Sequence, residues 1–237
     1  MEAVRPLRRA AGRIARTVIR SSDPARPGLS PATTPMSRSF GLDRGTPIDR
    51  YYIEGFLRAH AARIRGRVLE VGDSAYSRRF GSGVEASEVL HAGPGAPPGA
   101  RIGDLTQPET LPLDHADCFI CTQTLNFIFA AGDAVRGAHR LLRPGGTLLL
   151  TAAGISQISR YDMDRWGDFW RFTTASLERL LRPAFGDALT LTSYGNVLAA
   201  TALLQGLAVE DLPEPRLLDE HDPDYQVVIA AAARKSP

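Results

Sequence analysis

Residues 67–74, Arg-Val-Leu-Glu-Val-Gly-Asp-Ser, limit the choice of fold more than any other stretch of the sequence. They form a short apolar run that ends on an acid and leads into a turn of small residues. Gly66 and Gly72 bound the run, and its length suits a strand that is buried on both faces at the centre of a parallel sheet. Open α/β sheets bind ligands at the carboxyl ends of such strands, so the turn at Gly72 is a candidate ligand site.

A helix, a turn and a strand follow one another over residues 131–151. Apolar side chains recur at helical spacing over 131–142. The run Arg143-Pro144-Gly145-Gly146 then ends the helix, because proline cannot continue it and the glycines make the turn. The apolar runs 116–122 and 147–151 are predicted strands. Further strands are predicted over 88–92, 101–105, 188–194 and 225–230, and further helices over 47–64, 77–82, 175–181 and 197–208.

The first 39 residues differ in composition from the rest of the chain. Six arginines stand in the first twenty residues against one acid, and apolar residues recur between them at helical spacing, which predicts an amphipathic basic helix. Residues 21–39 are rich in Ser, Pro, Thr and Gly, as is typical of a flexible linker. The segment is either a solvated or loosely docked extension, or a transit peptide or surface-binding helix. We therefore predict a basic, partly flexible extension over 1–39 and a folded domain over 40–237.

The composition is that of a globular protein with one domain and tails. The chain has 237 residues, of which 43% are hydrophobic, and this argues against wholesale disorder. The net charge of +2 says little about partners. No apolar run reaches the roughly 20 residues of a membrane span. The basic segment lacks the interleaved aromatic residues of single-strand binders, so no nucleic-acid partner is expected.

The two cysteines, Cys118 and Cys121, have the spacing of a CxxC motif but lie inside an apolar run. Residues three apart on a strand point to opposite faces, and no second Cys or His pair follows at metal-ligand spacing. We predict two buried core residues and a reducing, cytoplasmic compartment. Asp162, Asp164 and Asp168 lack the glycine and the terminal glutamate of a calcium loop, so no metal site is expected.

The run Val68-Leu69-Glu70-Val71-Gly72, together with the helix, Pro-Gly-Gly turn and strand over 131–151, resembles the S-adenosylmethionine-dependent methyltransferases with a Rossmann-like fold. The resemblance covers about residues 40–235. It implies an α/β fold with a Rossmann-like, seven-stranded, mostly parallel sheet whose last strand is antiparallel, with helices on both faces. Tyr51-Tyr52, the segment 154–172 and the helix after Gly195 together are similar to bacterial methyltransferase-domain proteins found beside glycosyltransferase or natural-product genes.

The resemblance also implies S-adenosylmethionine as the cofactor and a set of residues that bind it. In the family the motif glycine lets the backbone approach the methionine part of the cofactor, and the acid before it belongs to the same pocket. An Asp after the third strand accepts from the adenine amino group. The family's ribose-binding acid at the end of the second strand is replaced by Gly93. The residues predicted to bind the cofactor are Glu70, Gly72, Asp73, Ser74, Asp104, Leu105, Thr122 and Gln123.

Residues 154–172, here named the lid segment, hold the densest group of polar and aromatic residues, including both tryptophans. The segment has neither helical nor strand periodicity, and long irregular loops usually carry function. In the family the segment after the fifth strand commonly caps the substrate. The other interpretation is a lid held only by structural salt bridges and aromatic packing. The residues predicted to bind the substrate are Arg50, Tyr51, Asn126, Tyr161, Trp166, Trp170 and Arg171.

Methyl transfer to an alcohol depends on alignment of the nucleophile and benefits from a general base. His60, His91 and His139 are placed as structural residues, whereas Asp162 lies in the lid segment. Asp162 is therefore the predicted catalytic base. We predict methyl transfer to a small hydroxylated acceptor, a sugar or a secondary metabolite, with O-methylation favoured. The apolar helix over 197–208 packs in the core or forms a homodimer contact.

An alternative function stays open at the level of the sequence. Gly93 and the missing further glycines of the first motif favour a protein that keeps the methyltransferase fold but has lost methyl transfer. Such a protein would act as a binding or partner protein or would catalyse a different reaction. Glu70, Gly72, Asp104 and the polar residues over 122–126 favour methyl transfer, since drift would be expected to erode them.

Overall fold

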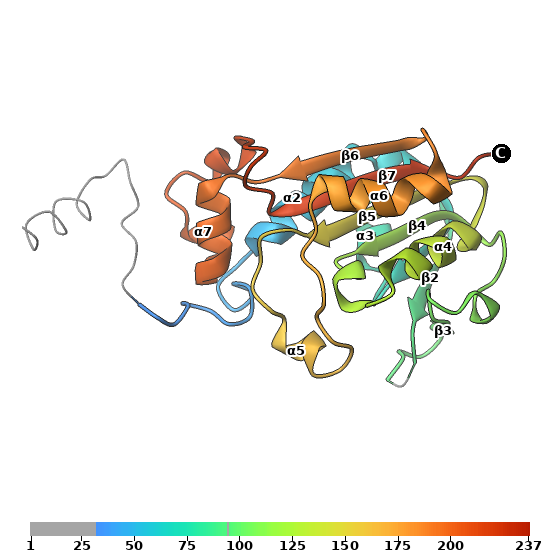
Figure 1. Ribbon diagram of the computed structural model, residues 1–237, viewed down its shortest axis with the longest axis horizontal. Coiled ribbons are helices and arrows are strands. Elements are labelled where there is room, and N and C mark those ends of the chain that lie inside the picture. The colour runs from blue at the N-terminus through green and yellow to red at the C-terminus, as the bar shows by residue number, and fades with distance from the viewer. Residues whose placement is uncertain (1–31, 94) are drawn as a thin grey trace, which may run out of the picture. The chain divides into compact units, whose positions relative to one another are not determined.

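A seven-stranded sheet with the strand order β3-β2-β1-β4-β5-β7-β6 forms the centre of the computed structural model (Figure 1). Neighbouring strands are parallel, except that β7 runs antiparallel to both β5 and β6. The predicted seven-stranded Rossmann-like sheet with an antiparallel last strand is therefore confirmed. The strands are β1 Gly66–Val71, β2 Val84–His91, β3 Arg101–Ile102, β4 Ala116–Thr122, β5 Leu142–Ala153, β6 Leu189–Tyr194 and β7 Val228–Arg234.

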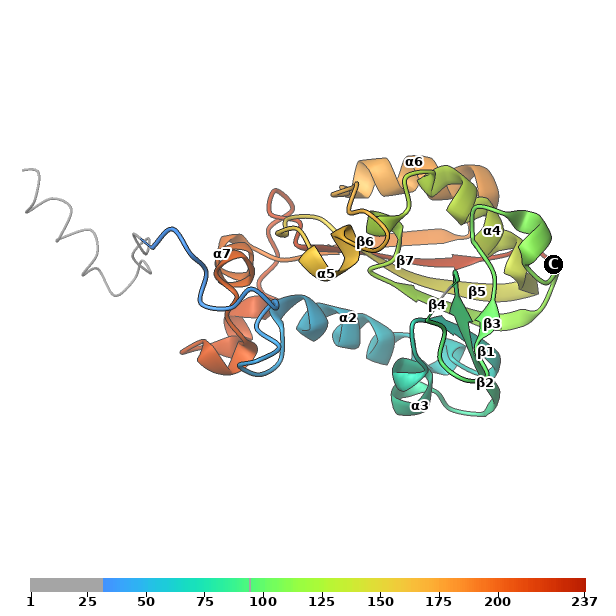
Figure 2. The ribbon, with the colours of Figure 1, turned by 90° about the horizontal axis from the view of Figure 1, so that it is seen from below.

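Helices cover both faces of the sheet (Figure 2). One apolar core joins the sheet to α4 Ala131–Leu141 and α6 Thr174–Phe185. A second core on the opposite face joins it to α2 Ile48–Ala59 and α7 Val197–Gln205, with the short α3 Ala75–Phe80 at its edge. This arrangement buries β1 and β4 on both sides, as their continuous apolar runs predict.

The structure describes residues 32–93 and 95–237, so the predicted basic helix over the first twenty residues lies outside the described residues. The chain from Met36 to Pro237 forms one compact unit. Met36 belongs to it because its backbone N–H donates to the Gln205 carbonyl at 2.7 Å. The Ser37 hydroxyl likewise bonds to Asp43. Residues 36–39, which the composition assigns to a flexible linker, are therefore held by hydrogen bonds.

Alternate residues of β4 belong to opposite cores. Phe119 and Cys121 pack on the side of α4, whereas Cys118 and Ile120 pack on the side of α2. Both cysteines are free and buried, and burial raises the pKa of each thiol to about 12. The prediction of two buried core cysteines on opposite faces is confirmed.

Residues 143–146 form a bulge rather than the predicted turn between a helix and a strand. The strand β5 begins at Leu142, directly after α4, and Leu142 pairs with Ala116 while Thr147 pairs with Cys118. Residues 143–146 on β5 therefore lie opposite the single residue Asp117 on β4, and they form no regular pairs with that strand. Gly145 has φ +78°, a left-handed conformation that glycine adopts without a steric penalty.

Several element boundaries differ from the sequence prediction. The strand β2 begins at Val84, so Glu88 lies inside the strand and not at its start. Thr173 caps α6, and its partner in the capping box is Ser176. Glu178 pairs with Arg182 one turn later, at an N–O distance of 2.5 Å. Strand β7 begins at Val228, because residues 225–227 still belong to the loop between the 3-10 turn Pro215–Asp219 and β7.

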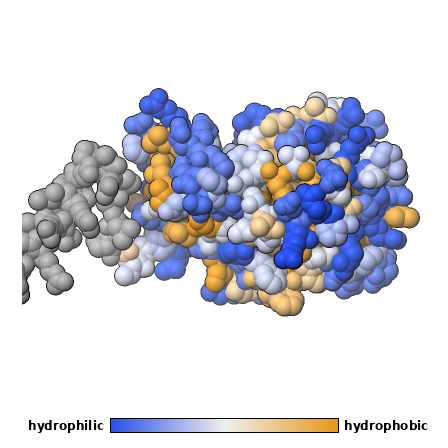
Figure 3. Space-filling view, turned by 45° about the horizontal axis from the view of Figure 1, so that its top comes forward, coloured by the Kyte–Doolittle hydropathy of each residue, from blue (hydrophilic) through white to orange (hydrophobic). Residues whose placement is uncertain are grey.

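The surface of the protein is mixed in character. On the face shown in Figure 3, hydrophobic residues form small separate patches among hydrophilic ones. Across the described residues, none of the helices is both long enough and apolar enough to cross a membrane.

Glu88, on β2, links β1, β3 and the start of β4 through hydrogen bonds. Its carboxylate accepts hydrogen bonds from Arg67 on β1 at 2.8 Å, from Arg101 on β3 at 2.9 Å and from His115 before β4 at 2.9 Å. Burial alone would raise the pKa of Glu88, but these three partners outweigh it and lower the pKa to about 2. A carboxyl group with a lowered pKa stabilises the fold at neutral pH, and this contribution is lost as the pH falls from about 4.5 towards 2.

We expect Glu88→Gln to lower the free energy of unfolding by about 2–3 kcal/mol at pH 7, because the amide keeps the shape of the carboxylate but loses its charge. Urea denaturation at several pH values between 7 and ~3 measures this, and the difference from the wild type should shrink towards the acid end. Glu85→Gln is the matched control, since Glu85 is exposed on the same strand and has no ion pair within the described part of the chain. If the free energy of unfolding of Glu88→Gln differed from that of the wild type by the same amount at all pH values, the lowered pKa of Glu88 would not be the source of the stabilisation.

Candidate active site

Three adjoining cavities lie along the carboxyl ends of the parallel strands, on the side of the sheet where α5, Arg160–Met163, projects (Figure 1). We name them by position. The β1 cavity, of about 290 Å³, lies at the end of β1, and the β2 cavity, of about 420 Å³, lies at the end of β2. The lid cavity, of about 150 Å³, lies between β4, β5 and the lid segment. Val71 lines both the β1 and β2 cavities, and Gln123 lines both the β1 and lid cavities.

The turn after β1 shapes the β1 cavity. Glu70 is 2% exposed, and its carboxylate accepts the backbone N–H groups of Tyr76 at 3.1 Å and Ser77 at 2.9 Å. Burial raises the pKa of Glu70, although these hydrogen bonds oppose the rise. The acid thereby fixes the start of α3 relative to β1. Gly72 follows with φ +88°, and no atom lies within 4 Å of the position that a Cβ would occupy. Its backbone therefore borders open space.

Gln123 at the end of β4 is strained and incompletely bonded. Its φ of +49° is uncommon for any residue other than glycine, and such strain clusters at functional sites. Its side-chain Nε2 is buried and has no hydrogen-bond partner in the protein. Burying an unsatisfied donor costs about 1–3 kcal/mol, so this amide group is a candidate to bind a ligand in the two cavities that it lines.

The β2 cavity is mostly apolar and is closed on one side by aromatic residues. Leu90, Ala92 and Leu105 line it together with Phe129 and Trp166. The Trp166 ring meets the ring of His91 edge to face, at 5.9 Å between centroids, so the lid segment reaches the end of β2. Apolar walls with one carboxylate suit a flat heteroaromatic ligand that carries an amino group.

Asp104 supplies the carboxylate of the β2 cavity. One of its oxygens, Oδ1, accepts from both the backbone N–H and the hydroxyl of Thr106 at 2.8 Å. The other oxygen accepts from the Gln107 amide at 3.4 Å, which is a long hydrogen bond. Oδ2 therefore keeps capacity to accept from a ligand.

The lid segment is anchored to β4 and β5 through Asn126, which is 1% exposed. The Asn126 amide donates to the Trp170 carbonyl at 2.8 Å and accepts from the Ala153 N–H at 3.1 Å. Its backbone carbonyl accepts from Phe169 at 2.8 Å. Arg171 binds Asp168, whose side chain is 1% exposed, at 3.0 Å. These bonds hold the lid segment over the lid cavity.

The structure brings most of the predicted residues to the three cavities and leaves some outside. Ser74 stands at the N-cap position of α3, without a capping hydrogen bond from its side chain, and lines none of the three cavities. Tyr51 faces a separate cavity beside Tyr194 and donates its hydroxyl to Asp219 at 2.8 Å. Tyr161 is 65% exposed. Trp170 stacks on Phe129 outside the cavities. The predicted residues that line the cavities are Arg50, Glu70, Gly72, Asp73, Asp104, Leu105, Thr122, Gln123, Asn126, Asp162, Trp166 and Arg171.

Asp49 is a candidate residue that the sequence did not single out. It lies in the first turn of α2 and lines both the β1 cavity and the lid cavity. Burial raises the pKa of Asp49, although the hydrogen bond from the Arg50 N–H at 2.8 Å opposes the rise. Asp49 forms no ion pair with any described residue. Its only sequence signal is an acid just after Pro47, which is equally typical of an ordinary helix start.

Gln157 is a second residue that the sequence did not single out, and it lines the lid cavity. Its Oε1 is buried and accepts no hydrogen bond within the protein. The lid cavity thus has a free donor, Gln123 Nε2, and a free acceptor, Gln157 Oε1, beside the carboxylates of Asp49 and Asp162. Among the residues that the structure describes, no group of three or more His, Cys, Asp or Glu side chains could hold a metal ion.

The fold is similar to that of several solved structures. A S-adenosylmethionine-dependent methyltransferase from Mesorhizobium loti has a TM-score of 0.53 and 17% identity, over 82% of this chain and 100% of that one. The N-methyltransferase NodS from Bradyrhizobium japonicum, in complex with S-adenosyl-L-homocysteine, has a TM-score of 0.51 and 14% identity, over 82% and 90%. The [4+2]-cyclase SpnF has a TM-score of 0.50 and 18% identity, over 81% and 84%.

Neither a protein-family model nor a curated protein sequence matches the chain. At identities of 14–18%, the structural similarity shows a shared fold and not a shared reaction. The chain therefore has the Rossmann-like fold of these three proteins, with the β1, β2 and lid cavities at the carboxyl edge of the sheet.

Proposed function

We propose that the protein is an S-adenosylmethionine-dependent methyltransferase that acts on a small hydroxylated acceptor. The observation that carries the proposal is the meeting of the β1 and lid cavities at Gln123, whose buried amide has no partner in the protein. A cofactor cavity that opens into an acceptor cavity is the arrangement that direct transfer between two ligands requires, because the reacting atoms must be held in line.

The residues around the β1 and β2 cavities suit this cofactor. The Gly72 backbone borders open space, so the methionine part would lie against it, and the apolar walls of the β2 cavity would hold the adenine beside Asp104. When bound, S-adenosylmethionine supplies a methyl group on a positively charged sulfur. In place of the family's ribose acid stands Gly93, and the Trp166 ring near His91 would cover that position and exclude water.

The lid cavity supports a hydroxylated acceptor. A hydroxyl group both donates and accepts, and it would satisfy the free Gln123 donor and the free Gln157 acceptor together. The volume of about 150 Å³ admits only part of a larger molecule, such as one sugar ring or one substituted ring of a secondary metabolite. These features favour O-methylation.

Two carboxylates could take the proton from that hydroxyl. Asp162, the base that the sequence predicts, lines the lid cavity and accepts from the Ser159 hydroxyl at 2.5 Å. Asp49 lines both cavities, and its raised pKa brings it nearer to the range in which a carboxylate accepts a proton efficiently. We propose Asp49 as the group that holds the proton and Asp162 as the group that orients the acceptor through its hydrogen bonds.

Two further features belong to the proposal. Cys118 and Cys121 are free thiols, which suits a reducing, cytoplasmic compartment. On α7, Val197 is 57% exposed and Leu204 is 46% exposed, and these side chains would lie at the contact if the protein forms a homodimer.

The similarity to SpnF, which is described as a cyclase, is the reason to test cofactor binding before methyl transfer.

We expect the purified protein to bind S-adenosylmethionine and S-adenosylhomocysteine with dissociation constants in the micromolar range, about −8 kcal/mol of binding free energy. Gly72→Ala should weaken both at least ~10-fold, because the new methyl group strains a left-handed backbone and projects towards the β1 cavity. Calorimetric titration measures the affinities.

Gly83→Ala is the matched control, since Gly83 also has a positive φ, +72°, and open space at its Cβ, but lies outside the three cavities. Both variants should lose a similar free energy of unfolding, and only Gly72→Ala should lose affinity. Absence of binding to the wild type at millimolar ligand would reject the proposed function. The alternative of a fold retained without methyl transfer would then stand.

We expect Asp49→Asn to reduce the preference for S-adenosylmethionine over S-adenosylhomocysteine, whose sulfur is neutral, by about 3–10-fold, because the sulfonium loses a facing negative charge. In the wild type this preference should rise with pH as Asp49, whose pKa is raised, becomes ionised. Glu70, Asp73, Arg50 and Tyr76 also line the β1 cavity, so the Asn variant is needed to isolate Asp49. The same titrations of Asp162→Asn should show the wild-type preference. An unchanged preference in Asp49→Asn would remove Asp49 from this role.

A further inference from the structure

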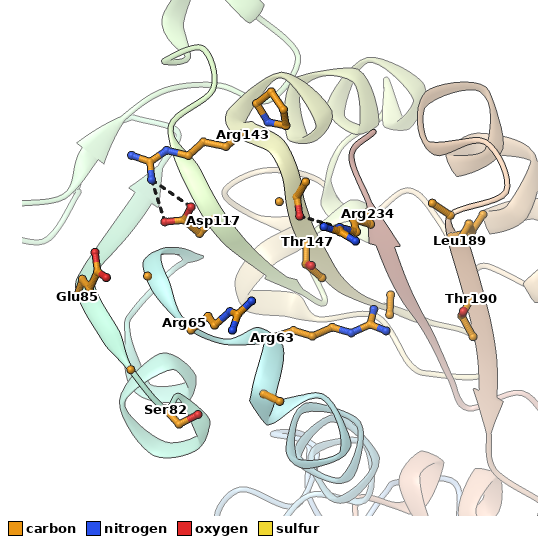
Figure 4. A pocket seen from close by; sticks show the side chains of 18 of the residues that line it. Arg63, Arg65, Ser82, Glu85, Asp117, Arg143, Thr147, Leu189, Thr190 and Arg234 are labelled. Atoms are coloured by element: carbon orange, nitrogen blue, oxygen red, sulfur yellow. Dashed lines mark hydrogen bonds and ion pairs between the residues drawn. The ribbon is translucent and has the colours of Figure 1, made fainter. Parts of the chain in front are cut away.

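A hollow of about 1270 Å³ lies at the amino-terminal edge of the parallel strands and away from the candidate active site (Figure 4). The beginnings of β1, β2, β4 and β5 border it, together with the beginning of β6 and the end of β7. None of its lining residues lines the β1, β2 or lid cavity. An inference about this hollow is therefore independent of the proposed function.

Four arginines line the hollow, and they differ in how they are bonded. Arg143 is neutralised by Asp117, at 3.0 Å. Arg234 uses its Nε to donate to the Gly145 carbonyl at 3.0 Å and has no carboxylate partner in the described chain. The side chains of Arg63 and Arg65 extend into the hollow in Figure 4, and neither forms a hydrogen bond or ion pair with a described residue. Three guanidinium groups thus face the hollow without a carboxylate partner.

The acids around the hollow do not offset these charges. Asp117 is already bound by Arg143 and by the backbone N–H of Arg67 at 2.7 Å. Asp187 is bound by Arg182, on α6, at 2.9 Å. Glu85 is the one lining carboxylate that no described residue engages. After these pairs are removed, three positive groups face one negative group, so the hollow attracts anions.

The floor of the hollow is polar. Thr147 and Thr190 line it from β5 and β6, and in the sheet Thr190 pairs with Ala232 while Thr147 pairs with Arg234. Neither threonine hydroxyl is engaged by another described side chain, and Ser82 adds a third hydroxyl at the rim. Guanidinium groups together with hydroxyl donors are the groups with which proteins bind phosphate oxygens.

We propose that this hollow is a second binding site, for a small phosphorylated ligand held by Arg63, Arg65 and Arg234 over the Thr147 and Thr190 hydroxyls. A nucleic acid fits the hollow less well, because single strands are bound by stacking of their bases on aromatic side chains and no lining residue is aromatic. The polar floor also disfavours an apolar protein surface. The site binds the phosphoryl groups of a sugar phosphate or of a free diphosphate through the same chemistry.

The test is calorimetric titration of the full chain with inorganic pyrophosphate at low salt. We expect a dissociation constant below ~1 mM for the wild type, and at least ~10-fold weaker binding in the double variant Arg63→Gln/Arg65→Gln. The control Arg38→Gln/Arg179→Gln removes the same charge from two exposed arginines that do not line the hollow, and it should bind within ~2-fold of the wild type. Thr190→Glu tests the same site by adding a negative charge to an exposed floor residue.

Three outcomes would overturn the proposal. The first is no binding of pyrophosphate to the wild type at ~10 mM. The second is equal weakening in the two double variants, which would mean that overall charge alone binds the ligand. The third is wild-type affinity in both Arg63→Gln/Arg65→Gln and Thr190→Glu, which would place binding elsewhere. If only a single-stranded oligonucleotide binds, and Arg63→Gln/Arg65→Gln abolishes that binding, the hollow is a nucleic-acid site. Titration with glucose 1-phosphate distinguishes a sugar phosphate from a free diphosphate.

Discussion

The pairing of β1 with β4, both buried on two faces, is the constraint on which the rest of the structure depends. Val68 pairs with Cys118 and Glu70 with Ile120, and the two strands run in parallel. Parallel neighbours end at the same edge of the sheet, so the turn after Gly72 and the strained Gln123 come together although 50 residues separate them. The candidate active site is a consequence of this register.

Two buried polar side chains, Glu70 and Asn126, then fix the positions of α3 and the lid segment at the carboxyl edge of the sheet. The Glu70 carboxylate bonds to the first N–H groups of α3. The Asn126 side-chain amide donates to the Trp170 carbonyl of the lid segment and accepts from the Ala153 N–H of β5. Both side chains are almost fully buried, where an unpaired polar group would be costly. Five buried side-chain atoms lack a partner among the described residues: Arg67 Nε, Gln123 Nε2, Arg140 Nε, Thr151 Oγ1 and Gln157 Oε1. Of these, Gln123 Nε2 and Gln157 Oε1 belong to residues that line the lid cavity, where a ligand could satisfy them.

The two edges of the sheet have different chemistry. At the carboxyl edge the cavities combine carboxylates, amides and aromatic rings, whereas the hollow at the amino edge combines arginines and hydroxyls. The difference follows from what surrounds each edge. The lid segment closes over the carboxyl edge, while Arg63 and Arg65, between α2 and β1, border the other edge without carboxylate partners among the described residues. Proposals for the two edges can therefore be tested separately.

The sequence by itself determined the layers of the fold and the place of the site. Continuous apolar runs identified β1, β4 and β5, and the family resemblance supplied the strand count and the antiparallel β7. Most of the predicted cofactor residues line the β1 and β2 cavities, because a motif at a strand end fixes which edge it faces. The tertiary structure decided where Asp49, Gln157 and Tyr51 lie relative to the cavities. Each lies on a helix or loop whose position depends on long-range packing and hydrogen bonds, which sequence periodicity does not encode.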